Sequence, residues 1–137
     1  MNGAFFFKSL NLKLWTGNLI WMRDWLLFAA SVIEISEGLP GTLARNHLAG
    51  QLVRSGTSPA LNYGEAQSAE SRNDFIHKMK ISLKELRETY NCLRVIKKKG
   101  WYTDGNLAIV LDENNQLISI FVKSIDTARK NNEKARR

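Results

Sequence analysis

Large apolar residues recur every three or four positions along four segments of the chain, a spacing typical of helices that bury one face. In the first segment these positions are Trp21, Trp25, Phe28, Val32, Ile35 and Leu39. Gly38 and Pro40 predict the end of this helix, because glycine accepts a left-handed cap and proline cannot continue the hydrogen-bond ladder.

The second segment is less regular. Thr42 is a suitable N-cap for a helix that begins at Leu43 and continues toward Gln67. Residues 55–60 in its middle are small or proline, so propensity alone predicts a loop there. The competing interpretation is one continuous helix that is kinked near Pro59.

The third and fourth segments predict the longest helices. Residues 72–99 carry an apolar series that Gly100 ends, and three lysines at 97–99 suit the carboxyl-terminal dipole of a helix. This helix would be about 40 Å long, a length typical of bundles. A similar series begins at Leu107 and reaches Ala128, with Asn114 among its positions. The polar residues 112–115 interrupt that series, as either a break or a solvated turn of helix.

These patterns predict an all-α protein, an antiparallel up-down-up-down four-helix bundle formed by residues 22–132. The chain of 137 residues has two prolines and nine glycines, too few turn residues for many short strands. Residues 1–21 are interpreted as an atypical N-terminal leader. It is either an extra helical turn or a segment outside the bundle that precedes a start at Met22. Residues 133–137 are expected to be a frayed basic tail.

Motif absences argue against catalysis. The sequence has no phosphate-binding glycine loop, no nucleophile elbow and no helical metal-ligand pair, so we expect no enzyme activity, no cofactor and no metal. The lone Cys92 excludes a disulfide framework and suits a cytoplasmic protein. No apolar run reaches the roughly 18 residues of a membrane span. His47, His77 and Cys92 are interpreted as packing residues, and Tyr63, Tyr90 and Trp101 as core or interface aromatics.

Positive charge is concentrated in one segment. The net charge is +7, and residues 71–100 hold nine basic and three acidic residues. On a helix, one stripe would contain, together with Asn91, the basic residues Lys80, Lys84, Arg87, Arg94 and Lys98. Such a stripe can follow a phosphate backbone. The competing interpretation is a solvated face whose middle is neutralised by Glu85 and Glu88, with Arg87 turned inward toward a carboxylate.

A second polar set predicts a structural network. It joins the second and third helices and fixes their register, and its members are Arg54, Asn62, Glu65, Glu85 and Glu88. Buried or half-buried charges of this kind persist where they are paired. Since no histidine stands at metal spacing beside these carboxylates, the set does not indicate a metal site.

The middle of the chain also resembles a known family. The motifs that carry the resemblance are residues 39–40 (LP), 44–58 (ARNHLAGQLVRSGTS), 62–67 (NYGEAQ), 70–71 (ES), 74–78 (DFIHK) and 83–89 (LKELRET). They are similar to the bacterial four helix bundle protein family, also called the ribosomal-RNA intervening-sequence protein family. The resemblance covers about residues 22–130 and does not include residues 1–21. In the family, the Ser-Gly-Thr-Ser segment lies within a helix, which favours the continuous, kinked helix here.

The resemblance implies an antiparallel bundle that assembles as a homo-oligomer, most often a pentamer, and it implies no enzyme activity. A related branch comprises accessory proteins of retroelements that bind nucleic acid and a reverse transcriptase. We therefore expect a homo-oligomer that binds RNA or DNA through residues 72–99. The alternative is an adaptor that docks an acidic protein partner, such as a reverse transcriptase or another nucleic-acid enzyme. The bundle interior is not expected to cover all of Trp25, Ile81, Val95 and Phe121, and exposed apolar residues mark interfaces.

Overall fold

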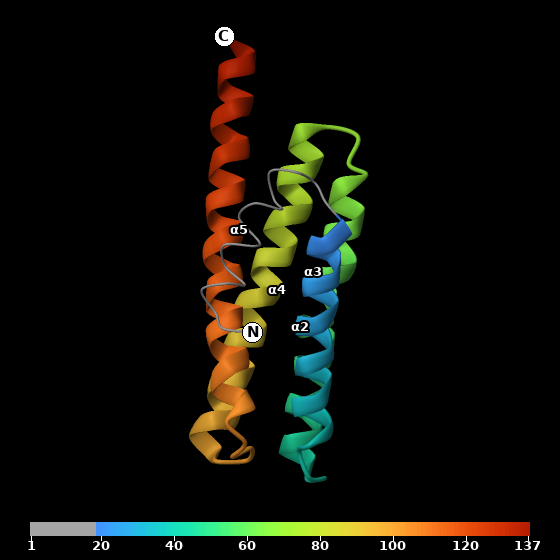
Figure 1. Cartoon of the computed structure of the whole chain (residues 1–137), viewed down its shortest axis with the longest axis vertical. Coiled ribbons are helices and arrows are strands. Elements are labelled where there is room, and N and C mark those ends of the chain that lie inside the picture. Colours follow the sequence, from blue (N-terminus) through green and yellow to red (C-terminus); the bar gives the residue numbers. More distant parts are fainter. Residues whose placement is uncertain (1–18) are drawn as a thin grey trace.

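The computed structural model describes residues 19–137, which form four helices and no strand within that range. The helices are α2 (Leu19–Glu37), α3 (Leu43–Gln67), α4 (Arg72–Lys99) and α5 (Asn106–Arg136). They run side by side in alternating directions, and α5 projects beyond the others at its carboxyl-terminal end (Figure 1). Each helix packs mainly against the next one in sequence, while α2 and α5 touch least. The predicted all-α four-helix class is confirmed.

The helix ends follow from local chemistry. The Thr42 hydroxyl accepts a hydrogen bond from the Arg45 amide at the start of α3, and Ser71 does the same for Asp74 at the start of α4. Gly100 closes α4 in the left-handed region with a φ of +64°, where a side chain would be strained. The sequence places these ends correctly because each depends on the residues beside it.

The small residues of α3 lie inside the helix and not in a loop. The α3 helix passes through Pro59 without interruption, and Ser55, Gly56 and Pro59 are all buried. A Cβ atom added at Gly56 would overlap the side chain of Val32 on α2. On the neighbouring side, the hydroxyls of Ser55 and Thr89 lie 2.9 Å apart. Small side chains therefore let α2 and α4 approach α3 closely, and tertiary packing overrides the loop propensity.

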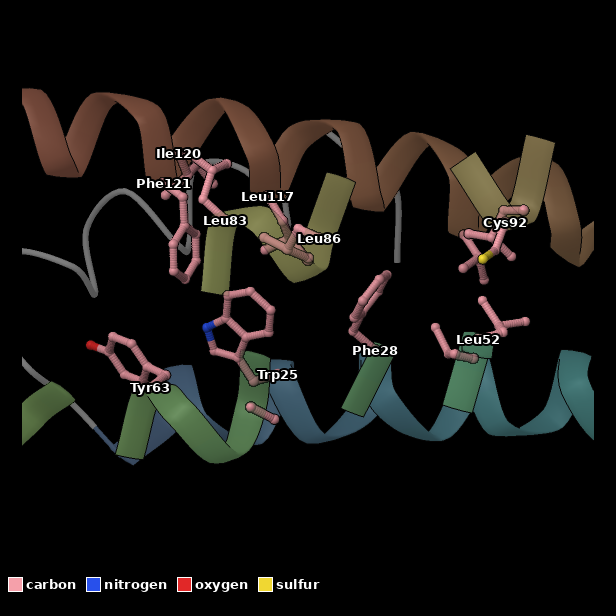
Figure 2. Close-up of a cluster of buried hydrophobic side chains, with 14 of the residues drawn as sticks. Trp25, Phe28, Leu52, Tyr63, Leu83, Leu86, Cys92, Leu117, Ile120 and Phe121 are labelled. Atoms are coloured by element: carbon pink, nitrogen blue, oxygen red, sulfur yellow. The ribbon is translucent and has the colours of Figure 1, made fainter. Parts of the chain in front are cut away.

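Aromatic residues fill the centre of the bundle. The rings of Trp25 on α2 and Phe121 on α5 pack edge to face with their centroids 5.1 Å apart, and Figure 2 shows them together in the core. Both residues are buried, whereas Ile81 and Val95 are exposed. The bundle interior therefore covers Trp25 and Phe121, and of the four residues only Ile81 and Val95 are left uncovered.

The polar residues 112–115 do not break α5, and this turn of helix is solvated only in part. Asp112 and Asn115 are exposed, whereas Asn114 is completely buried. With its carboxamide turned so that both ends are satisfied, the nitrogen donates to the Leu86 carbonyl at 3.0 Å and the oxygen accepts from the Tyr90 amide at 3.3 Å. A buried amide that bonds to two backbone groups of a neighbouring helix fixes the register of α4 and α5.

The helices at both ends of the bundle extend beyond the predicted bounds of residues 22–132. The α2 helix begins at Leu19, so the last three residues of the segment 1–21 are helical, and the interpretation of residues 1–18 lies outside the described residues. At the other end, α5 continues to Arg136, so residues 133–136 are part of this helix, and fraying of the basic tail stays a prediction. Alanine, lysine, arginine and glutamate in this stretch favour helix, and the i,i+4 ion pair of Asp126 with Lys130 supports it.

Candidate functional site

The basic stripe lies on the surface of α4. Its five basic side chains and Asn91 are all exposed, and at 1.5 Å per residue the stripe from Lys80 to Lys98 extends about 27 Å along the helix. Within residues 19–137, none of the five makes an ion pair. The Arg94 guanidinium lies 5.7 Å from the centre of the Tyr90 ring, a cation–π contact that leaves its charge in place.

The acidic residues of α4 turn away from this stripe. Glu85 and Glu88 both face α3, where the Arg54 guanidinium lies 3.1 Å from a Glu85 oxygen and also donates to Glu88. Gln51 accepts a further hydrogen bond from Arg54 at 3.1 Å. The hydrogen bond to Glu88 and the negative charges of both carboxylates raise the pKa of Arg54. The two carboxylates therefore have a partner on α3 and do not neutralise the stripe.

Two expectations about this region are corrected by the geometry. Arg87 does not turn inward toward a carboxylate, because it is exposed on the side of α4 that faces α5. Asn62 and Glu65 do not join the Arg54 network. The Asn62 amide donates to Ser58 one turn earlier on its own helix, and Glu65 lies about 16 Å along α3 from Arg54.

A groove between α4 and α5 extends the basic surface beyond one helix. It has a volume of about 720 Å³, and it is lined by Lys80, Leu83, Lys84, Arg87, Ser119, Val122, Lys123, Ile125, Asp126 and Arg129. Three cations of the α4 stripe thus face two cations of α5. Asp126, the one acidic residue of the lining, pairs with Lys130 at 3.1 Å.

Sequence reasoning missed Lys123 and Arg129. The signal was present, because Val122, Asp126 and Arg129 recur at helical spacing on one face of α5. This face could not be recognised as part of a basic surface, because the sequence alone does not say which side of α5 adjoins α4.

The remaining candidates do not form a reactive centre. His47 and His77 are both exposed, so the packing interpretation is wrong for them; they lie on the outward faces of α3 and α4. Cys92 is buried as expected, and burial, followed by the charge of Glu88, raises the pKa of its thiol. Across residues 19–137 no three metal-binding side chains come together.

Two further features are a local contact of cations with an aromatic ring and the character of the helices with respect to a membrane. At the end of the bundle, Arg45 and Lys99 lie 5.3 and 5.9 Å from the centre of the half-buried Trp101 ring. Among the helices of the described part of the chain, none combines the length and apolar character needed to cross a bilayer.

The fold and its basic face define an all-α antiparallel bundle with one cationic side. Residues 18–123 match the family described as 23S rRNA-intervening sequence protein, and the chain belongs to that family. A crystal structure from Bacteroides thetaiotaomicron, described as a protein with unknown function from the S23 ribosomal protein family, is similar to this chain. The two are 27% identical with a TM-score of 0.68, over 76% of this chain and 96% of the other. No curated protein sequence matches the chain.

Proposed function

We propose that this protein is a non-enzymatic, cytoplasmic nucleic-acid-binding bundle that contacts phosphates through the exposed face of α4. The observation that carries the proposal is the pairing of Glu85 and Glu88 with Arg54 on α3. Because both carboxylates pair with Arg54, the five cations of the stripe make no ion pair within residues 19–137. An array of unpaired cations along about 27 Å is the electrostatic arrangement that releases counterions from a nucleic acid.

The family name supports RNA as the first ligand to test, since it refers to an intervening sequence of 23S rRNA. Exposed apolar residues support self-association. We propose that the assembly is a cyclic homo-oligomer, namely a pentamer. The exposed apolar residues lie on all four helices and include Leu26 and Leu27 on α2, Leu61 on α3, and Ile81 and Val95 on α4. In a ring, every subunit would present the same stripe, so weak phosphate contacts would add through multivalency.

The test is a triple substitution, Lys84→Gln, Arg94→Gln and Lys98→Gln, measured by fluorescence anisotropy with structured RNA and with duplex DNA. Its matched control replaces three exposed cations outside the stripe and the groove, namely Arg72, Lys134 and Arg136, also by glutamine. Affinity should fall for the stripe variant. Since each phosphate contact contributes a slope of about 0.7–0.9, its log affinity should depend less steeply on log salt by roughly 2–3.

Two results would contradict the proposal. Equal affinity and salt slope for the stripe variant and the control would show that α4 is not the contact surface. If no nucleic acid bound near physiological salt, the adaptor function would replace nucleic-acid binding, and capture of an acidic protein partner by the parent but not by the stripe variant would support it. Sedimentation of a monomer at micromolar concentration would remove the homo-oligomer.

A further inference from the structure

The α4–α5 groove combines two chemistries that the stripe alone does not. Its floor is apolar: Leu83 and Ile125 are buried there, and Val122 is 44% exposed. Its rims are cationic, with Lys80, Lys84 and Arg87 on α4 and, on α5, Lys123 and Arg129. A ligand that fits both must therefore be apolar along one side and anionic along its edges.

We propose that this groove binds a single strand of nucleic acid, with one base face against the exposed Val122 and phosphates against the two rims. The inference rests on the proposed nucleic-acid binding and names the form of ligand that the groove selects. A single strand presents unstacked base faces together with a flexible, charged backbone. A duplex stacks its bases inside, so its charged outer surface would gain nothing from the apolar floor.

The dimensions of the groove agree with a short stretch of one strand. A volume of about 720 Å³ falls in the range of roughly 300–1,000 Å³ that is typical of small-ligand sites. Along the helices, the α4 rim from Lys80 to Arg87 spans about 10 Å, and the α5 rim from Lys123 to Arg129 spans about 9 Å. The Asn132 side chain donates to Asn73 at 2.7 Å and joins the two helices farther toward the carboxyl-terminal end of α5.

The same features disfavour an acidic amphipathic helix as the occupant. A helix that docks in a groove uses several apolar anchors, spaced over two turns, and needs matching exposed apolar area on its partner. Of the apolar side chains in the floor, only Val122 is substantially exposed, because Leu83 and Ile125 are already covered by the bundle. Five cations with no ion pair within residues 19–137, against one exposed apolar side chain, favour a polyanion.

The experiment separates the floor from the rims. Val122→Asn makes the floor polar at an exposed helical position where valine and asparagine have similar helix propensity. Its control is Val53→Asn on α3, where a valine that is 36% exposed lies outside the groove. The rim variant Lys123→Gln with Arg129→Gln is compared with Lys134→Gln with Arg136→Gln, which removes the same charge from α5 outside the groove. The probes are labelled oligouridine and a blunt RNA duplex of the same length.

We expect the parent protein to bind oligouridine more tightly than the duplex. Val122→Asn should weaken oligouridine binding about three- to fivefold and leave duplex binding unchanged, because the lost contact is apolar. The rim variant should weaken oligouridine binding more than its charge-matched control. Melting curves of all variants establish that each is folded.

Three outcomes would overturn the inference. The first is a duplex that binds as tightly as the single strand, and the second is a Val122→Asn variant that behaves like Val53→Asn. If in either case the α4 stripe variant still loses affinity for both probes, nucleic-acid binding stands and only the single-strand groove fails. The third is binding of an acidic amphipathic peptide that oligouridine does not displace, which would identify the groove as a protein-docking site.

Discussion

The close approach of α2 and α3 at Gly56 predicts a change in stability that can be worked out from the structure. A Cβ atom at this position would lie 3.1 Å from both Cβ and Cγ2 of Val32, and closer still to Cγ1. These distances are shorter than van der Waals contact, and a β-branched side chain in a buried site has no free rotamer to adopt. Gly56→Ala must therefore push the two helices apart.

The magnitude follows from two opposing effects. Overpacking of a core by one methyl group typically costs about 1–3 kcal/mol. Replacing a helical glycine by alanine gains about 1 kcal/mol of helix propensity. Gly50 lies in the same helix and is exposed, and nothing stands within 4 Å of an added Cβ there. Gly50→Ala should therefore be stabilising by about 1 kcal/mol, and Gly56→Ala should be less stable than Gly50→Ala by about 1–3 kcal/mol.

Urea unfolding of the parent and both variants, followed by circular dichroism at one fixed protein concentration, measures this difference. The comparison between the two alanine variants cancels helix propensity and leaves the steric term. Adding Val32→Ala to Gly56→Ala should recover part of the loss, so the double variant should be more stable than the sum of the single effects predicts. Equal stability of the two glycine variants would refute the close packing of α2 on α3.

Two further predictions concern buried polar groups between α3 and α4. Thr89→Val leaves the buried Ser55 hydroxyl without its partner and should cost about 1–2 kcal/mol of unfolding free energy. Adding Ser55→Ala to this variant should reduce that loss. If the two single effects were additive in a double-mutant cycle measured by urea unfolding, the hydrogen bond would be contradicted. Burial and, to a smaller extent, the Glu88 carboxylate raise the pKa of the Cys92 thiol, so its thiolate fraction at mildly alkaline pH is below that of a free cysteine. Alkylation by iodoacetamide should therefore be slow and should accelerate only at higher pH. Glu88→Gln should lower this pKa and speed the reaction, and an unchanged rate in that variant would refute the electrostatic part.

Local signals predicted the secondary structure well. The apolar spacing, the N-cap residue Thr42 and the helix end at Gly100 depend on residues close in sequence, and each is found where it was expected. Local propensity fails where a distant helix decides the outcome. Residues 55–60 have loop propensity, but they are helical, as the family resemblance favoured, because their small side chains admit α2 and α4.

The candidate site shows the same division. The sequence predicted the stripe of cations on α4, since helical spacing alone aligns these residues. It also predicted a network that joins Arg54 on α3 to Glu85 and Glu88 on α4, and these ion pairs are present. It did not predict that Asn62 and Glu65 lie outside this network, or that Arg87 stays exposed. These outcomes depend on how far each helix is rotated about its axis, which the core packing sets.

By itself, the sequence determined that this chain forms long amphipathic helices, where most of them begin and end, and which segment carries the positive charge. Those properties arise from interactions over one or two helical turns. Only the tertiary structure decided that Asn62 lies outside the Arg54 network, that Arg87 stays exposed, and that Lys123 and Arg129 of α5 face the α4 stripe across an apolar groove. The physical reason is that periodicity fixes which side of a helix is apolar. Which other helix lies beside each remaining side depends on side-chain packing across the whole bundle.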